Sequence, residues 1–192
     1  MTRIVAGFAG SLTLAVPKTG TRPTSDRVRE AIFSALEARD ALRFARVLDL
    51  YAGTGGLGLE AASRGARSVV LVEKSQTAAA MCRKNTEAVL KMAPNRDAPK
   101  ISTTGQSVQA FLNSATAEFD LVFIDPPYDL DESELTQNLA ALAPLLSEDA
   151  LVVLERGSRS PEPAWGTGLV PSRRKAYGET IVWYAEPADA DD

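Results

Sequence analysis

The chain has 192 residues, 45% of them hydrophobic and 24% charged, with a formal net charge of −4. This length suits one domain, or one domain with an appendage, and the composition is that of a globular protein. There is no histidine and only one cysteine, Cys82. Serine–histidine–aspartate and cysteine–histidine nucleophiles and histidine-ligated zinc sites are therefore excluded, and we expect no metal. A lone cysteine cannot form an internal disulfide, which favours a reducing, cytoplasmic setting.

The charges are distributed unevenly along the chain. Residues 1–46 carry eight basic and four acidic side chains, and residues 156–175 carry five basic and one acidic. Residues 118–134 carry seven acids and no base, and the last seven residues hold four more acids. The net charge alone argues against a nucleic-acid partner, but the basic segments near both ends keep that partner open.

The N-terminal part predicts a hairpin and a helix. Two apolar segments separated by glycine and serine indicate strands over residues 3–6 and 12–16, in preference to a signal peptide. Apolar residues at helical spacing from Val28 to Leu36 follow the possible N-caps Thr24, Ser25 and Asp26. No run of about 18 apolar residues is present, so no membrane span is expected.

From residue 46 onward, predicted strands alternate with predicted helices. Strands are expected over residues 46–51, 68–72, 100–103, 119–124 and 150–154. Helices are expected after the glycine loop as far as residue 64, over 75–92, around 108–112 and over 135–146. A loop is expected over 157–172, and a hairpin with strands 174–177 and 180–184 follows. This alternation predicts an α/β fold in which a parallel sheet has helices on both faces and ends in an antiparallel hairpin.

A glycine-rich loop joins the first strand of this sheet to its helix. Gly53, Gly55 and Gly58 have the spacing of a dinucleotide-binding turn, and Glu73 ends the next strand. Glycine lets a cofactor approach the backbone, and Glu73 can accept both ribose hydroxyls. Asp49 favours a cation, such as the amino group or sulfonium of S-adenosylmethionine, over a pyrophosphate cofactor. A loop-stabilising role for Asp49 is the alternative.

The sequence Asp125-Pro126-Pro127-Tyr128 directly follows a predicted buried strand. Two prolines fix an extended turn and remove two N–H donors, so that hydrogen-bond acceptors remain. The Asp125 carboxylate and the carbonyl oxygens of the turn can accept from a planar amino group while Tyr128 stacks on its ring. Such acceptors direct the nitrogen lone pair toward an electrophilic methyl group, so positioning supplies most of the rate. A structural proline-rich turn is the alternative.

Together these motifs resemble those of class I S-adenosylmethionine-dependent methyltransferases that act on exocyclic amines. Three further segments resemble the RsmD family, and the resemblance extends from about Arg3 to Tyr184. These segments are Arg3-Ile-x-Ala-Gly7, Arg22-Pro-Thr-x-x-Arg27-Val-Arg29-Glu30 and Lys175-x-Tyr177-Gly178-x-Thr180. The resemblance implies a Rossmann-like fold, S-adenosylmethionine as cofactor, and methylation of a guanine N2 amine in bacterial 16S rRNA, the guanine at position 966. It further implies a β-hairpin extension over residues 1–23, a methyltransferase domain over 24–186 and an acidic, frayed tail over 187–192.

The resemblance also assigns roles to individual residues. The implied cofactor-binding residues are Asp49, Tyr51, Gly53, Thr54, Gly55, Gly58, Glu73, Lys74, Gln106 and Ser107, and the implied catalytic residues are Asp125, Pro126, Pro127 and Tyr128. Related enzymes often place an acid near the adenine, where this chain has Gly105-Gln106-Ser107, so an amide or backbone group has to serve there. The family's N-terminal hairpin is often basic, whereas residues 10–14 of this chain contain no base.

The basic residues near both ends are candidates for contacts to RNA phosphates. They are Arg22, Arg27, Arg29, Arg173, Arg174 and Lys175, and for each arginine a solvated surface position is the alternative. The target guanine has to be flipped out of its stack to reach the site. We expect a monomer that acts on 16S rRNA, the small subunit or an assembly intermediate. The competing hypotheses are an adenine-N6 methyltransferase of DNA or RNA, an NAD-dependent dehydrogenase and a non-catalytic RNA-binding module.

Overall fold

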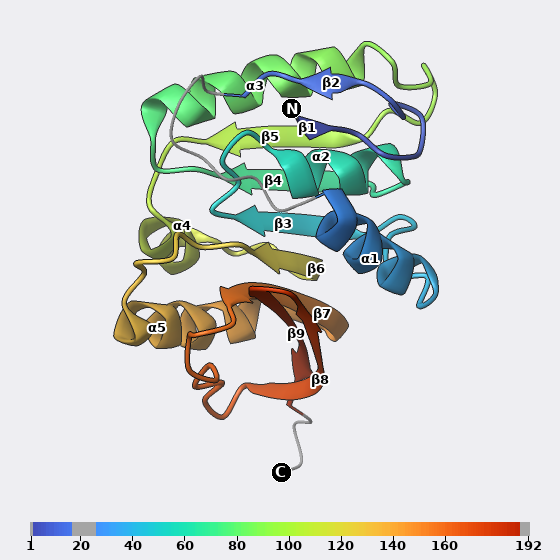
Figure 1. Ribbon diagram of the computed structural model, residues 1–192. Helices are drawn as coiled ribbons and strands as arrows, with labels where there is room; N and C mark the ends of the chain where they lie inside the picture. Colours follow the sequence, from blue (N-terminus) through green and yellow to red (C-terminus); the bar gives the residue numbers. More distant parts are fainter. Residues whose placement is uncertain (1, 17–25, 189–192) are drawn as a thin grey trace.

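A seven-stranded sheet forms the centre of the computed structural model, which describes residues 2–16 and 26–188 (Figure 1). Its strands are β3 (Arg46–Leu50), β4 (Ser68–Val72), β5 (Lys100–Thr104), β6 (Phe119–Ile124), β7 (Leu146–Gly157), β8 (Leu169–Tyr177) and β9 (Thr180–Pro187). The order is β5-β4-β3-β6-β7-β9-β8, with β3 to β7 mutually parallel and β9 antiparallel to both β7 and β8. The predicted α/β fold with an antiparallel C-terminal hairpin is confirmed.

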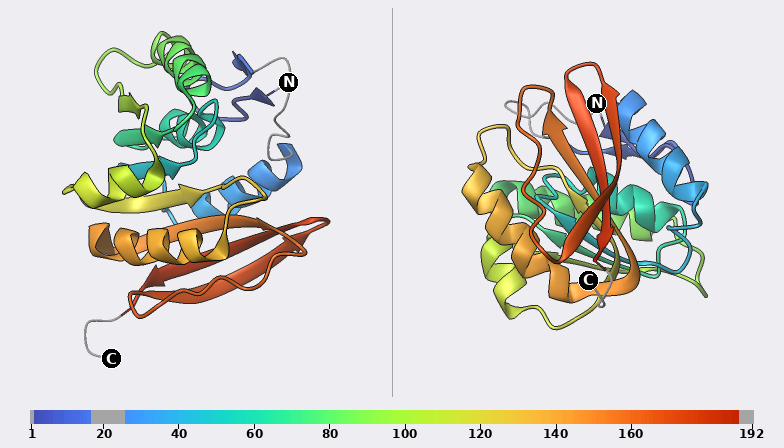
Figure 2. Two further views of the ribbon diagram at one scale, coloured as in Figure 1. Left: turned by 90° about the vertical axis from the view of Figure 1, so that its left-hand side faces the viewer. Right: turned by 90° about the horizontal axis from the view of Figure 1, so that it is seen from below.

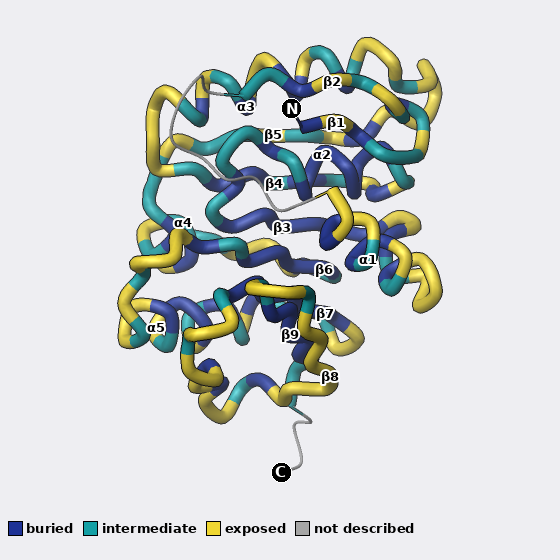
Figure 3. The backbone as a smooth tube through the Cα atoms, in the orientation of Figure 1, coloured by how far each residue is buried: buried dark blue, intermediate teal, exposed yellow. Residues whose placement is uncertain are grey.

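Helices cover both faces of the sheet (Figure 2). They are α1 (Asp26–Glu37), α2 (Gly56–Ser63), α3 (Gln76–Leu90), α4 (Val108–Ser114) and α5 (Glu132–Leu142), followed by the 3-10 turn η1 (Ala143–Leu145). Successive strand residues point to opposite faces. Val47 therefore joins the core that α1, α2 and α3 cover, whereas Leu48 and Leu50 join the core under α4 and α5. Burial on both faces explains why the central strands are almost entirely apolar (Figure 3).

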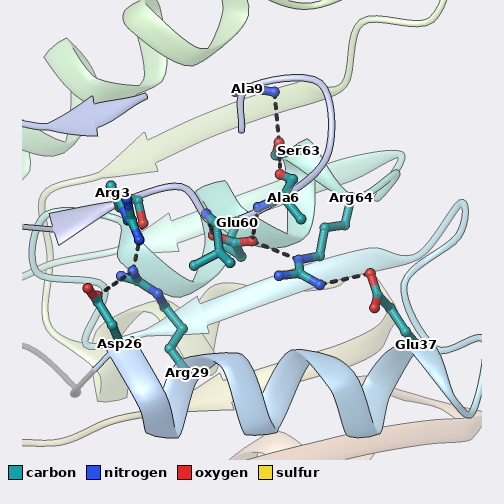
Figure 4. A network of polar contacts seen from close by, with 10 residues as sticks. Arg3, Ala6, Ala9, Asp26, Arg29, Glu37, Glu60, Ser63 and Arg64 are labelled. Atoms are coloured by element: carbon teal, nitrogen blue, oxygen red, sulfur yellow. Dashed lines mark hydrogen bonds and ion pairs between the residues drawn. The ribbon is translucent and has the colours of Figure 1, made fainter. Parts of the chain in front are cut away.

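The N-terminal hairpin consists of β1 (Thr2–Arg3) and β2 (Thr13–Leu14), which are shorter than predicted. Beyond β1 the backbone N–H groups of Val5 and Ala6 donate to the carboxylate of Glu60 at 2.7 and 3.0 Å, so they are not available to the partner strand. Glu60 belongs to α2 and is fully buried, and it also accepts from Arg64 Nε at 2.7 Å (Figure 4). The hairpin is thus attached to α2 by a buried carboxylate.

Three predicted boundaries near the C-terminus are wrong. Helix α5 ends at Leu142 instead of 146, because Pro144 has no N–H to continue the helix and the chain passes through η1 into a longer β7. Strand β8 begins at Leu169, inside the predicted loop, and its residues from Val170 to Ala176 are exposed on both sides, so it shows no apolar alternation. Strand β9 extends to Pro187, the first residue of the predicted tail, and residues 189–192 lie outside the described part.

Within residues 2–16 and 26–188, no helix has the length and hydrophobicity needed to cross a bilayer. The parallel strands β3 to β7 place their carboxyl ends at one edge of the sheet, the edge where open α/β folds bind their ligands.

Candidate active site

A cleft of about 1100 Å³ opens at this edge, and we call it the carboxyl-edge cleft. Most of the residues predicted from the sequence line it, although they come from five separate segments of the chain. They are Arg29, Asp49, Tyr51, Gly53, Thr54, Glu73, Lys74, Ser107, Asp125, Pro126, Pro127 and Tyr128. A second hollow, of about 760 Å³, lies around Phe44 and Asp120 and contains none of the predicted site residues that the structure describes.

The glycine loop and Glu73 form one rigid unit. Glu73 accepts the N–H of Gly53 through Oε2 at 2.8 Å and the N–H of Ser75 through Oε1 at 2.6 Å. Gly53 has a φ of 56°, and a Cβ placed on it would meet no atom within 4 Å, so its backbone faces open space. The carboxylate is thereby fixed in orientation and retains lone pairs for further donors, as a ribose diol requires.

Gly55 and Gly58 lie behind the cleft surface and are not among its lining residues. Gly55 has a φ of 86°, and a Cβ on it would lie 3.1 Å from Cys82 Sγ. A Cβ on Gly58 would lie 2.4 Å from Cδ2 of Leu71, and the Gly58 N–H donates to Asp49 Oδ2 at 2.8 Å. These two glycines permit the turn and the close packing of α2 on β4.

Asp49 is a buried carboxylate on the cleft wall, with 1% of its surface exposed. Burial is the largest influence and raises its pKa to about 7, with smaller contributions from the nearby charges of Asp125 and Glu73, against the hydrogen bond from Gly58. A cation in the cleft would favour the ionised form of Asp49. Its hydrogen bond to Gly58 also shows that it stabilises the loop, so both predicted roles have a structural basis.

The Asp125–Tyr128 turn leaves the end of β6 beside β7, which continues to Gly157. Ile124 pairs in register with Leu154, and Asp125 and Glu155 directly follow these two residues. The Tyr128 side chain is 68% exposed, and the Cβ position of Gly157 lies 3.5 Å from its ring. A flat, accessible ring therefore stands next to a group of acceptors.

Two asparagines that the sequence analysis did not assign support the cleft. Asn85 on α3 donates to the carbonyl of Thr54 at 2.9 Å and bonds both the N–H and the carbonyl of Ala15, joining the hairpin to the glycine loop. Asn138 on α5 donates to the Tyr51 hydroxyl at 2.8 Å. Both asparagines are almost completely buried, and each stands among the apolar residues on the inner face of its helix. In the sequence, a polar residue at such a position indicates a buried hydrogen bond.

The far end of the cleft involves the loop after β5. Ser107 lines the cleft and caps α4 by accepting the N–H of Ala110 at 3.2 Å. Gln106 is not among the lining residues. The loop is held by the side chain of Gln76, whose Nε2 donates to the carbonyl of Gly105 at 3.2 Å.

The residues predicted to contact RNA differ in accessibility. Arg22 lies outside the described residues, and Arg27 is exposed. Arg29 is 2% exposed, and its Nη2 donates to the Arg3 carbonyl at 2.6 Å and to Asp26 at 2.8 Å, which makes it a structural link between α1 and the hairpin (Figure 4).

The basic residues of β8 point to opposite faces of the sheet. The guanidinium carbon of Arg173 lies 5.9 Å from the centre of the Tyr184 ring. That of Arg174 lies 5.3 Å from the centre of the Trp183 ring, which is on the opposite side of β9. Lys175 shares the Arg173 face by strand alternation. The predicted patch is therefore divided between two surfaces, although all three residues are exposed.

The charge of the carboxyl-edge cleft is strongly negative. Its described lining includes two bases, Arg29 and Lys74, and seven acids, which are Asp49, Glu73, Asp125, Asp129, Asp131, Glu134 and Glu155. No group of these acids, or of any other described His, Cys, Asp or Glu residues, is arranged as a metal site. These acidic lining residues instead suit a nucleoside whose hydroxyls donate to Glu73 and whose attached group is cationic.

Comparison with known proteins identifies the family. A family model described as Conserved hypothetical protein 95 matches residues 2–186. Ribosomal RNA small subunit methyltransferase D of Escherichia coli (strain K12) is 33% identical over 178 residues, which are 92% of this chain and 85% of that protein. The protein of the same name from Haemophilus influenzae is 33% identical over 162 residues, 83% of this chain and 80% of its own.

Solved structures agree in fold. A hypothetical protein of Thermus thermophilus has a TM-score of 0.81 at 32% identity, with 97% of this chain and 99% of that chain covered. Magnesium protoporphyrin IX methyltransferase from Synechocystis PCC 6803, solved with bound S-adenosylmethionine, has a TM-score of 0.66 at 15% identity over 88% of this chain and 87% of its own, a similarity of fold. The Rossmann-like methyltransferase fold is thus confirmed, and the chain belongs to the RsmD family.

Proposed function

We propose that this protein methylates the N2 amine of a guanine in the RNA of the small ribosomal subunit, with S-adenosylmethionine as cofactor. The family resemblance points to the guanine at position 966 of 16S rRNA. One observation carries the proposal: the Asp125–Tyr128 acceptor turn and the Glu73–Gly53 unit open into the same cleft. A methyl donor and an amine acceptor can therefore meet there.

The described residues fit the cofactor. Glu73 would accept its ribose hydroxyls, the open backbone at Gly53 would allow close approach, and Asp49 would face its cationic methionine part. When bound, S-adenosylmethionine supplies a methyl group on a positively charged sulfur, and the electron pair of the broken carbon–sulfur bond stays on that sulfur. Ser107 and the neighbouring backbone would contact the adenine, because the lining residues there include no acid.

The acceptor turn orients the amine. The Asp125 carboxylate and the carbonyl oxygens of the turn accept N–H bonds from N2, so the nitrogen lone pair points out of the base plane toward the methyl group. Tyr128 provides a ring on which the flipped base stacks. As nitrogen forms its new bond to carbon it loses one proton, and an oxygen of Asp125 would accept that proton.

RNA contacts would come from basic residues near the N-terminus and from β8. Arg22, Arg27, Arg173, Arg174 and Lys175 remain candidates for phosphate binding, whereas the buried Arg29 would act by holding the hairpin at the cleft wall. Thr2 and Val16 of the hairpin also line the cleft. We therefore treat residues 1–23 as an extension of the domain over 24–186, and its described part, residues 2–16, contributes to the cleft.

The proposal includes a monomeric, cytoplasmic enzyme. The substrate would be 16S rRNA, either in the small subunit or in an assembly intermediate.

The test uses small ribosomal subunits from a strain that lacks the modification. Incubation with S-adenosylmethionine labelled at its methyl group should label 16S rRNA, and mass spectrometry of the digested RNA should find one N2-methylguanine. Asp125→Ala should abolish transfer while calorimetry still detects cofactor binding. Transfer of label to DNA adenine or to a protein, with none in 16S rRNA, would refute the proposal.

A further inference from the structure

We infer that Glu155 makes the enzyme selective for guanine, by accepting the N1–H of the base whose N2 amine is bound at Asp125. This inference rests on the proposed function, because it concerns the base that enters the cleft. It adds a specificity-determining residue that none of the motifs contains.

Glu155 follows Leu154 on β7 as Asp125 follows Ile124 at the end of β6. The two strands are parallel and in register as far as Ile124 and Leu154, so each acid directly follows the last paired residue of its strand. Both side chains line the carboxyl-edge cleft, although only 8% of Glu155 is exposed. A carboxylate has about four lone-pair sites, so Glu155 can accept from a base while it keeps other contacts.

The packing of Tyr128 places the stacked base on the Glu155 side of the strand. Residues two apart in a strand point to the same face, so the Cβ position of Gly157 indicates the direction of the Glu155 side chain. That position lies 3.5 Å from Cδ1 of Tyr128. A base stacked on the Tyr128 ring would therefore lie on the face of β7 from which the Glu155 side chain projects.

The Watson–Crick edge of guanine matches two adjacent carboxylates. It presents the N1–H and the N2 amine side by side, and flipped bases are commonly recognised by hydrogen bonds on this edge. The N1–H can bind Glu155, while the N2 amine binds Asp125 and the carbonyl oxygens of the turn. Adenine presents an acceptor at N1, which would face the Glu155 carboxylate without a proton between them. Such a repulsive contact is an effective source of selectivity.

The base 2,6-diaminopurine tests this contact, because it keeps the N2 amine and replaces the N1–H of guanine by an acceptor. It also replaces the O6 carbonyl by an amine, a difference that is the same for the wild-type protein and for a variant at Glu155, so the comparison between the two proteins isolates the N1 contact. Small subunits reconstituted with guanine or 2,6-diaminopurine at the target position should compete in one reaction, and mass spectrometry should measure both methylated bases. The wild-type protein should favour guanine by about tenfold to a hundredfold, the usual value of one good base contact. In Glu155→Gln the Nε2 can donate to N1 of 2,6-diaminopurine, so the preference should fall at least about tenfold or invert.

A matched control and a second readout separate the outcomes. Glu148→Gln changes an exposed glutamate at the other end of the same strand and should keep the wild-type ratio. Binding of the two substrates to the protein saturated with S-adenosylhomocysteine gives the same ratio without turnover, so an inactive variant is still informative. A wild-type ratio in Glu155→Gln by both measurements would overturn the role of Glu155. Absence of transfer to guanine by the wild-type protein would instead refute the proposed function.

Discussion

Replacing Asp49 by asparagine should stabilise the protein without cofactor. Burial of Asp49 raises its pKa from 3.8 to about 7, so its ionisation is unfavourable in the folded state. Because the folded-state pKa lies above the unfolded one, the stability that the protonated form contributes at low pH is lost as the pH rises to about 7. At about 1.4 kcal/mol for each factor of ten in proton affinity, the loss amounts to at most about 4 kcal/mol.

The Asp49→Asn side chain is neutral at every pH and keeps an oxygen for the Gly58 N–H. The variant should therefore exceed the wild-type protein in free energy of unfolding by up to about 4 kcal/mol at about pH 8, and the difference should vanish at about pH 4. Urea unfolding at both pH values, without cofactor, measures this difference. Asp97→Asn, at an exposed position, should change the free energy by less than about 0.5 kcal/mol at either pH. A gain in Asp49→Asn that does not depend on pH would refute the reasoning.

Cofactor binding should show the opposite preference. A cation binds the ionised form of Asp49 more tightly, so S-adenosylmethionine should release a proton from the wild-type protein below about pH 7, and its affinity should fall as the pH falls. Calorimetry in two buffers of different ionisation enthalpy counts that proton. Asp49→Asn should bind more weakly and release none. Equal proton release by both proteins would exclude Asp49 as the linked group.

Three further variants test the support of the site. Glu60→Ala removes a buried carboxylate that accepts from two hairpin N–H groups and from Arg64, so it should lower the free energy of unfolding by about 3–5 kcal/mol. Glu37 is the exposed partner of Arg64, and Glu37→Ala should lower the free energy of unfolding by less than about 1 kcal/mol in the same urea titration. Gly58→Ala should cost about 1–3 kcal/mol through its clash with Leu71. Gly53→Ala meets no atom and should cost about 1–2 kcal/mol through the backbone strain of its φ of 56° alone. Asn85→Ala should weaken cofactor binding in calorimetry because Thr54 loses its support, and unchanged affinity would limit Asn85 to the hairpin.

The alternating core of the fold could be predicted because several signals agree there. Strand β4 and strand β6 have the predicted bounds, since each contains four consecutive apolar residues, 69–72 and 121–124, that end at an acidic residue. Only the last four residues of strand β8 were predicted, because it lies at the sheet edge and its exposed residues lack the alternation that a half-buried strand shows. The N-terminal hairpin was predicted with strands that are too long, because the contact between Val5 and Glu60 joins residues 55 positions apart.

The site was predicted at the level of motifs, and single residues within the motifs differ in role. Spacing alone could not separate Gly53, which faces the cleft, from Gly58, which packs on Leu71. Likewise, Arg29 carries the charge expected of an RNA contact but is buried beneath the hairpin. The division of Arg173 and Arg174 between two faces follows from strand alternation, so a strand predicted there already implied it.

The acidic charge of the chain and an RNA substrate are compatible because the two kinds of charge serve different contacts. Acids gather in the carboxyl-edge cleft, where the proposed cofactor brings a cation and the proposed base brings only N–H donors to Asp125 and Glu155. Phosphates would meet the exposed bases of β8 and Arg27 outside it. The absence of histidine fits the same arrangement. Methyl transfer to a bound amine requires hydrogen-bond acceptors that orient the amine and one group that takes up its proton, and Asp125 can serve as both. The segregation of charge along the sequence therefore corresponds to a separation between base recognition and backbone binding.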